Sequence, residues 1–311
     1  MRFYEKTVIS ASRRTDIPAF YMDWFMERIR LGFFETPNPY NGRIYRIQAT
    51  VDRVHSIVFW SKNFGPFIQS EAGEKLTRQG YRLYFQFTVN SQNPLLEPGI
   101  PPLQQRLEQL EYICRHFNPA TVAWRFDPIC FYRNRNNELK NNLQDFTQIA
   151  NTASHLGVRR CITSFMDHYP KIRQKNRLNS EVKLVDPPLE TKIRVLTKLG
   201  KILENCEMTL EACCEPQVLA QLGQNANAGP SSCISGSLLA ELFGGSPCLK
   251  KDAGQRVAAG CQCTRSRDVG SYRHHPCRHG CLYCYASPAM NAGANHKHFQ
   301  SDGSPCLKSA P

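Results

Sequence analysis

The sequence predicts an α/β protein with a parallel sheet, on three observations: apolar runs of strand length, helical patterns between them, and polar residues where the strands end. The runs are rich in the β-branched and aromatic residues of buried strands. They span residues 7–12, 54–60, 81–89, 121–126, 158–165 and 208–213. We expect six strand–helix units in a parallel sheet, either open or curled into a partial (βα)6 TIM-like barrel.

The segments between the strands have the apolar periodicity of amphipathic helices. One of them ends at Gly80, a typical helix stop. The expected helices span residues 20–32, 67–80, 103–117, 139–157 and 189–206. Their lengths suit crossovers between parallel strands. A short additional strand is expected over residues 43–49.

The composition changes after residue 215, and we expect three parts in the chain. Residues 1–222 would form the barrel-like domain, and the small polar residues of 223–232 would form a linker. Residues 233–311 would form a cysteine-rich segment that begins with a short helix and folds back over the barrel mouth. No apolar run reaches the ~18 residues that a membrane span needs. The first residues also lack a secretory apolar region, so we expect a cytoplasmic protein without a membrane partner.

The net charge of +13 favours anionic substrates or partners. The densest basic stretch is residues 159–183, with seven Lys or Arg against two acidic residues. Such a stretch is typical either of a phosphate-contacting surface or of an ordinary solvated loop. It lacks the interleaved aromatic residues of a platform that binds single-stranded nucleic acid.

Polar side chains follow the expected strands at the points where they end. In parallel α/β sheets, chemistry gathers just beyond these carboxyl ends. One polar terminus would be a capping residue, but polar residues at all six ends favour a lined cavity. The residues predicted to line it and to act in catalysis are Arg13, Arg14, Asp16, Lys62, Asn90 and Asp127. Other polar residues at strand ends are Arg125, Asp167, His168, Glu211 and Glu215.

The fourteen cysteines are unevenly distributed. In a reducing cytoplasm they should be thiols or metal ligands rather than disulfides. Four lie in apolar strand or helix patterns of the first 212 residues, as small buried thiols do: Cys114, Cys130, Cys161 and Cys206. The other ten lie between Cys213 and Cys306, and their density points to metal binding.

Three late cysteines, Cys277, Cys281 and Cys284, form the motif CRHGCLYC. Zinc sites usually have four ligands, so zinc would need a histidine from residues 274–279 as the fourth. The uneven three-cysteine spacing favours a [4Fe–4S] cluster whose fourth iron has no protein ligand. Such an iron can chelate S-adenosylmethionine, and the reduced cluster can then cleave the sulfonium to a radical that abstracts hydrogen from a substrate.

The motif resembles the cysteine loop of radical S-adenosylmethionine enzymes, Cys-x₃-Cys-x-aromatic-Cys, and is similar to that of the spore photoproduct lyase branch. The chain as a whole resembles a bacterial family of uncharacterised proteins, domain of unknown function 1848. The segments that carry this resemblance are ISASRRTDIPAFY, IVFWSKN, FQFTVN, WRFDPI, CISGSLLAELFG and CQCTRSRDVGSYRHHPCRHGCLYCYA. They extend over nearly the whole chain.

The resemblance implies a radical enzyme that uses a [4Fe–4S] cluster and S-adenosylmethionine. It makes Cys277, Cys281 and Cys284 the cluster ligands and places Tyr283 against the nucleoside of S-adenosylmethionine. An electron donor such as flavodoxin or ferredoxin is implied as a partner. In such enzymes the loop ordinarily follows the first barrel strand. Here it follows the sixth strand and a linker, so the arrangement would be a permutation.

Other cysteines precede the motif, and a closed cluster that included them could not bind S-adenosylmethionine. A separate four-cysteine site could instead hold a second iron–sulfur cluster or a zinc ion. The alternative is that these cysteines are buried reduced thiols. The predicted ligands of the second site are Cys214, Cys233, Cys261 and Cys263, while Cys248 and Cys306 are expected to bind no metal.

Two classes of function therefore remain. The first is a radical S-adenosylmethionine enzyme, which needs a closed polar cavity and is favoured by the polar strand ends. The second is a non-catalytic zinc or iron–sulfur module that binds nucleic acid through its basic surface. The substrate of the enzyme would be a nucleic acid or nucleotide, or a small anionic molecule held by Arg13, Arg14 and Lys62.

Overall fold

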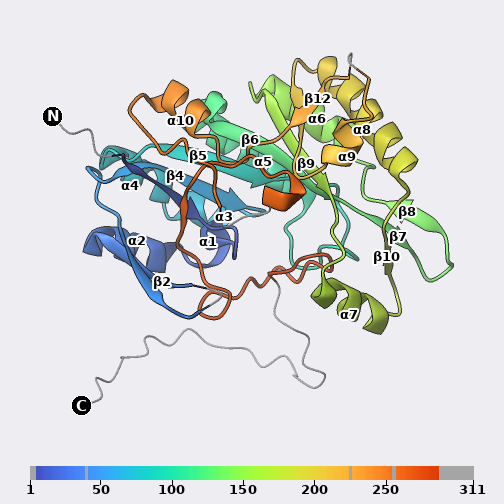
Figure 1. The fold of residues 1–311 in the computed structure, drawn as a ribbon, viewed down its shortest axis with the longest axis horizontal. Helices are drawn as coiled ribbons and strands as arrows, with labels where there is room; N and C mark the ends of the chain where they lie inside the picture. The colour runs from blue at the N-terminus through green and yellow to red at the C-terminus, as the bar shows by residue number, and fades with distance from the viewer. Residues whose placement is uncertain (1–4, 39–40, 224–225, 254–256, 287–311) are drawn as a thin grey trace.

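A parallel β-sheet forms the centre of the protein (Figure 1). The computed structural model describes residues 5–38, 41–223, 226–253 and 257–286. Within these ranges the sheet has eight strands in the order β12-β11-β9-β6-β5-β4-β1-β13, and every neighbouring pair is parallel. The strands are β1 (Thr7–Ala11), β4 (Val54–Ser61), β5 (Leu83–Thr88), β6 (Val122–Ile129), β9 (Arg160–Phe165), β11 (Thr209–Ala212), β12 (Ala228–Pro230) and β13 (Arg267–Asp268).

The prediction of a parallel α/β sheet is confirmed. All six expected strands are present, from β1 to β11, and they lie side by side in chain order. The sheet is open in the described part of the chain, because its edge strands β12 and β13 do not pair with each other. The structure therefore contains no closed barrel among the described residues.

Helices connect the strands and cover one face of the sheet (Figure 1). They are α1 (Ile17–Phe20), α2 (Met22–Leu31), α3 (Gly65–Gln69), α4 (Ala72–Arg78), α5 (Leu103–His116), α6 (Phe146–His155) and α8 (Leu189–Glu204). Two of the expected helices are interrupted, the first at Tyr21 and the second near Glu71, whose φ is 52°. Positive φ lies outside the helical region, so the chain turns there.

The expectation of one helix over residues 139–157 was wrong in its first part. Residues Leu139–Asn141 form β8, and α6 begins only at Phe146. The side chain of Asn141 accepts a hydrogen bond from the backbone N–H of Leu143 at 3.1 Å, and that of Asn142 accepts one from Cys130 at 2.8 Å. Such side chains compete with the helical hydrogen bonds of the backbone.

Smaller elements surround the main sheet. β8 pairs with β7 (Phe131–Arg133), which also pairs with β10 (Lys183–Val185). A separate hairpin joins β2 (Phe33–Pro37) to β3 (Ile44–Gln48), so the additional strand expected over 43–49 is present. The remaining α-helices of the described residues are α7 (Pro170–Leu178), α9 (Pro216–Leu219) and α10 (Gly236–Phe243).

The two faces of the main sheet have different covers, because successive side chains of a strand point to opposite faces. Phe59, Phe85 and Trp124 belong to a large aromatic core under the helices. Their neighbours along the same strands pack on the other face against residues after β12. That second core contains Val8, Val58, Tyr84, Ala123, Ile162, Ile234 and Leu239. The C-terminal segment is therefore the cover of the second face.

β13 completes one edge of the sheet by pairing with β1, with Ile9 opposite Arg267. The carboxylate of Asp268 accepts hydrogen bonds from Ser12 Oγ at 2.5 Å and from the backbone N–H of Arg13 at 2.7 Å. A Cβ at Gly270 would collide with Ser12 Oγ, so a residue with a side chain does not fit there. These contacts bring the chain that follows β13 to the carboxyl end of β1.

β12 lies within the stretch predicted to be a linker, and its neighbours 224–225 lie outside the described residues. Residues 287–311, which include Cys306, also lie outside them. The division of the chain into a domain, a linker and a C-terminal segment stays a prediction. Across the described ranges, the helices are all too short or too polar to span a membrane.

A pH-dependent contact joins β4 to the end of α10. The Nε2 of His55 lies 2.8 Å from the carbonyl oxygen of Gly244, and burial lowers the pKa of His55 below its ordinary 6.5. The unfolded chain therefore takes up a proton as the pH falls through about 6.5, and stability present above that value is lost. We expect His55→Gln to flatten the decline in unfolding free energy between about pH 7 and pH 5, measured by denaturant titration. An unchanged slope would contradict this role.

Candidate functional site

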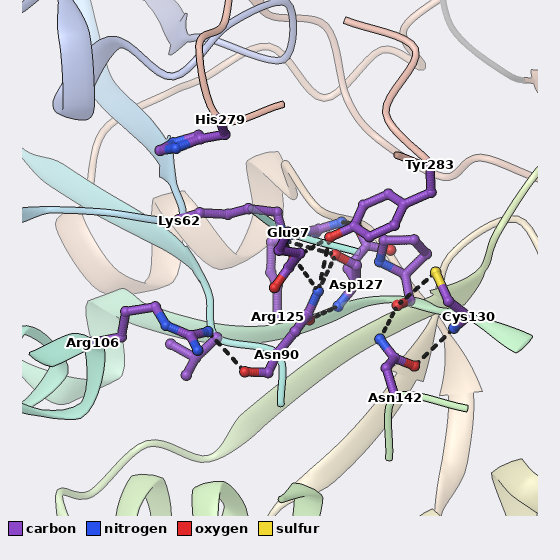
Figure 2. Close-up of polar contacts among 12 residues, drawn as sticks. Lys62, Asn90, Glu97, Arg106, Arg125, Asp127, Cys130, Asn142, His279 and Tyr283 are labelled. Carbon is purple, nitrogen blue, oxygen red and sulfur yellow. Dashed lines mark hydrogen bonds and ion pairs between the residues drawn. The ribbon is translucent and has the colours of Figure 1, made fainter. Parts of the chain in front are cut away.

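A buried polar network lies at the carboxyl ends of β4 and β5 (Figure 2). At its centre, Glu97 Oε1 accepts hydrogen bonds from Lys62 Nζ at 2.8 Å and from Asn90 Nδ2 at 3.0 Å. Lys62 and Asn90 follow the ends of β4 and β5, whereas Glu97 comes from the loop before α5. The side chain of Glu97 is only 4% exposed. The centre of the network is therefore shielded from water.

Lys62 and Glu97 form an ion pair inside this network. Burial by itself would lower the pKa of Lys62, but the negative groups around it, Glu97 first among them, together raise the pKa. Burial would likewise raise the pKa of Glu97, but the Lys62 ammonium holds it below its ordinary value. Both side chains are therefore charged at neutral pH.

Tyr283 brings the cysteine motif into the network (Figure 2). Its hydroxyl donates a hydrogen bond to Glu97 Oε1 and accepts one from Asn90 Nδ2 at 3.2 Å. The Nζ of Lys62 lies 5.5 Å from the centre of its ring. Burial, and then the Glu97 charge, raise the pKa of Tyr283 well above its ordinary value. The phenol thus stays protonated and anchors the motif to the sheet.

Asp127 joins the network from β6. Its Oδ2 accepts a hydrogen bond from Arg125 Nη2 at 2.6 Å, and its Oδ1 accepts one from Ser164 Oγ at 2.5 Å. Its backbone N–H donates to Asn90 Oδ1 at 2.9 Å. Arg125 and Asp127 are two residues apart on one strand, so they share the face opposite the helix-packed Trp124.

A second anchor holds the cysteine motif near α1. The Nε2 of His279 lies 2.8 Å from Asp16 Oδ2, which also accepts a hydrogen bond from the backbone N–H of Lys62 at 2.9 Å. The backbone N–H of Gly99 donates to the carbonyl of His279 at 3.0 Å. A Cβ at Gly99 would lie 2.6 Å from that carbonyl oxygen, so glycine permits this approach.

These anchors place the three motif thiols beside the polar network. Cys277 is 8% exposed and Cys281 is 2% exposed. Burial raises the pKa of Cys277 to about 12, and burial followed by the Glu97 charge raises that of Cys281 well above its ordinary value. Cys284 contributes to both shifts, so the three thiols lie within electrostatic reach of one another. Thiolates are the ligands that iron–sulfur clusters and zinc prefer, so this donor set fits either group.

The thiols are not preassembled into a coordination shell. No three His, Cys, Asp or Glu side chains within the described ranges form a group that could hold a metal ion as they stand. Metal binding requires deprotonated thiols, so it would have to be accompanied by proton loss and by rotation of the side chains.

A second group of five thiols lies on the sheet face covered by the C-terminal segment. We call it the thiol ring, and its members are Cys213, Cys214, Cys233, Cys261 and Cys263. The Sγ of Cys213 lies 3.7 Å from that of Cys214 and 3.7 Å from that of Cys233. Cys233 also interacts with Cys263, Cys263 with Cys261, and Cys261 with Cys214, because each thiol shifts the pKa of its neighbour. The structure thus brings together the four cysteines predicted for a second site, and adds Cys213.

Arg13 and Arg14 lie nearer to β13 than to the Glu97 network. The guanidinium of Arg13 is 5.2 Å from the centre of the Trp60 ring, and its Nη1 donates to Ser266 Oγ at 3.3 Å. Burial would lower the pKa of Arg13, but Cys263 and Asp268 raise it. Arg14 Nη1 donates to the carbonyl oxygen of Gly270 at 3.1 Å.

The predicted cavity residues therefore divide into three groups. Lys62, Asn90 and Asp127 converge in the network, Asp16 anchors the cysteine motif, and Arg13 and Arg14 contact the segment around β13. Sequence reasoning missed Glu97 as a site residue and considered His279 only as a zinc ligand. The one signal for Glu97 was an acidic residue isolated in the apolar, Pro-rich stretch NPLLEPGIPP.

Two adjoining cavities of about 590 and 410 Å³ lie beyond the ends of β9 and β11. Asp186, Lys192, Cys214 and Glu215 line both of them. The smaller cavity is also lined by Tyr169, whose ring centre is 5.7 Å from that of Tyr285. This hollow, which we call the groove, therefore extends from the thiol ring towards the cysteine motif.

A comparison with known protein families matches most of the chain. The family model described as "Domain of unknown function (DUF1848)" matches residues 8–286. The chain belongs to this family. The DUF1848 match begins in β1 and ends just after Tyr285, so it includes the polar network, the thiol ring and the cysteine motif. No curated protein matches the sequence significantly.

Removing the charge of Glu97 tests the central ion pair. In Glu97→Gln the Lys62 ammonium would remain buried without its counter-charge, and we expect the free energy of unfolding to fall by about 3–5 kcal/mol. The double variant Glu97→Gln, Lys62→Met removes both charges and should recover part of this loss. Denaturant titration of the three proteins measures the effect. If the single and double variants have the same free energy of unfolding, the loss of stability does not come from the unpaired Lys62 charge.

Proposed function

We propose that the protein is a radical S-adenosylmethionine enzyme whose [4Fe–4S] cluster is held by Cys277, Cys281 and Cys284. The observation that carries the proposal is the parallel pairing of β13 with β1. The cysteine motif follows β13, and β13 stands beside the first strand of the sheet. The motif thus follows an edge strand, β13, that lies next to β1 in the sheet although it comes last in the chain. A permuted radical enzyme is expected to have this arrangement. The same arrangement supports a sheet that curls as a partial barrel.

The chemistry of the loop supports an open cluster rather than a closed site. Three thiols of the motif are within electrostatic reach of one another, and the adjacent histidine His279 is engaged by Asp16 at 2.8 Å. The backbone N–H of Ala286 donates to Cys284 Sγ at 3.3 Å, a contact of the kind that tunes iron–sulfur clusters. When bound, the cluster and S-adenosylmethionine would supply a reductive cleavage that starts radical chemistry.

The residues of the chain have separate tasks in this proposal. Tyr283 and His279 fix the motif to the sheet through Glu97 and Asp16. In that position Tyr283 would lie against the bound S-adenosylmethionine, as the resemblance implies. Lys62 supplies positive charge beside Cys281, which favours the thiolate. Its second partner is the backbone carbonyl of Asp127, at 3.4 Å.

The groove is the proposed binding place of the substrate. It lies at the carboxyl ends of β9 and β11, where ligands bind in parallel sheets, and it carries both signs of charge. Lys192 Nζ pairs with Asp186 at 2.8 Å in its wall, and Arg173 lines its smaller part. The cationic side chains of Lys192 and Arg173 would bind a small anionic molecule or a nucleotide there. Electrons would come from a donor such as flavodoxin or ferredoxin.

A non-catalytic metal-bearing module that binds nucleic acid is the second candidate. It is favoured by α7, which carries Lys171, Arg173, Lys175 and Arg177 and no acidic residue. Lys171 Nζ donates to the carbonyl of Tyr285 at 3.2 Å, so this basic helix lies beside the cysteine motif. Tight, salt-dependent binding of oligonucleotides without cleavage of S-adenosylmethionine would favour this candidate.

Metal analysis tests the cluster directly. Protein purified and reconstituted without oxygen should hold about four irons bound through the motif, and Cys281→Ala should lose them. Cys130→Ala is the matched control, because Cys130 is a buried thiol of the same apolar cluster but lies outside the motif. Iron and sulfide content, the thiolate-to-iron absorption band, and a shift of the electron paramagnetic signal on adding S-adenosylmethionine are the measurements. A motif that binds zinc and no iron would overturn the proposal.

Asp127→Asn separates turnover from cluster binding. An amide cannot form the charged pair with Arg125, so groups at the end of β6 should shift while the motif thiols stay in place. We expect unchanged iron content and a loss of 5′-deoxyadenosine formation on the order of 10²-fold. Asp23→Asn, an exposed change on α2, is the control and should behave as the parent protein. Full activity in Asp127→Asn would remove Asp127 from the site.

A further inference from the structure

The thiol ring has features that a set of merely buried cysteines would not need. Its five members come from three segments: the end of β11, the residue Cys233 after β12, and the Cys-x-Cys pair before β13. These segments are far apart in the chain, yet the sulfurs of Cys213 and Cys233 lie 3.7 Å apart. The remaining thiols shift the pKa values of their neighbours in the ring. The ring is also separate from the cysteine motif, which packs in a different apolar cluster.

Two sulfur–sulfur distances in the ring match those around one tetrahedral ion. A zinc–sulfur bond of about 2.3 Å in a tetrahedral site puts neighbouring sulfurs about 3.8 Å apart. Cys213 Sγ lies 3.7 Å from the sulfurs of both Cys214 and Cys233. A four-iron cluster sits between its ligands and would hold their sulfurs further apart. Loss of the thiol protons and rotation of the side chains would then bring four sulfurs around a single ion.

Two buried guanidinium groups compensate the negative charge that thiolates would bring. Arg125 Nη1 donates to Cys233 Sγ at 3.1 Å. Arg13 lies near Cys263 and Cys233, and its Nη2 is buried without a hydrogen-bond partner. The two groups lie on the Trp60 ring, each with its carbon 5.2 Å from the ring centre. Four thiolates around zinc carry a net charge of about −2. Arg125 and Arg13, which also pair with Asp127 and Asp252, place positive charge beside it.

We propose that the thiol ring is a structural zinc site that uses four of its five sulfurs. The ion ties the residues after β12 and before β13 to the end of β11. It thereby fixes the segment that covers the second face of the sheet and positions β13 beside β1. One thiol remains outside the coordination shell. This spare thiol is either Cys213 or its neighbour Cys214. Cys214 lines the groove and has a φ of 60°.

The experiment measures zinc and iron separately in the full-length chain, by elemental analysis of anaerobically purified protein. The parent should hold about one zinc ion per chain beyond any iron. The double variant Cys261→Ala, Cys263→Ala should lose the zinc and unfold at a lower temperature, while Cys248→Ala should keep it. Cys248 is the matched control because it is buried in the same segment and lies outside the ring. Single variants of Cys213 and Cys214 identify the spare thiol, because only one of them should lose zinc.

A second measurement does not depend on the folding of variants. Cobalt(II) added to the metal-free parent protein should give the intense thiolate-to-cobalt absorption of a tetrahedral four-sulfur site, and added zinc should abolish it. The inference fails if the parent holds no zinc and gives no cobalt band. Loss of iron in place of zinc from the double variant would also overturn the zinc assignment. Cys281→Ala keeps the two proposals distinguishable, since it should lose iron and retain zinc.

Discussion

The carboxylate of Glu97 meets three polar groups inside the protein, from Lys62, Asn90 and Tyr283. Each group comes from a different part of the chain: β4, the end of β5, and the cysteine motif. A buried carboxylate is costly unless it is paired and hydrogen-bonded, so these partners must converge if the interior is to be stable. The position of the cysteine motif relative to the sheet is therefore coupled to the electrostatics of one side chain.

Successive side chains of a strand point to opposite faces of the sheet, and this explains how two cysteine-rich regions contact the same sheet. Side chains on one face meet the helices and are aromatic, whereas the other face carries Arg125 and receives the C-terminal segment. Arg125 donates to both Cys233 in the thiol ring and Asp127 in the polar network. Asp127 is bonded in turn to Asn90, which contacts Glu97. A buried chain of hydrogen bonds thus joins the thiol ring to the contacts of the cysteine motif.

The strands could be predicted because each is an apolar run bounded by polar residues, and parallel order follows from the helices between them. The polar strand ends likewise placed Lys62, Asn90 and Asp127 at one rim. Glu97 could not be predicted in the same way, because it lies in an irregular loop whose path depends on backbone contacts with the motif, such as Gly99 to His279. The helix pattern over 139–157 failed because the side chains of Asn141 and Asn142 accept hydrogen bonds from the backbone N–H groups of Leu143 and Cys130 instead.

The pairing of β1 with β13 also has a consequence for the order in which the protein is synthesised. β1 emerges from the ribosome early, but its partner at the sheet edge is among the last described residues to be made. At the usual pace of translation the interval is on the order of tens of seconds. During that time the outer edge of β1 is open to pairing with other chains. The thiols of the motif then arrive on a sheet whose other strands have already been made, so loading of the proposed cluster would be the last step of maturation.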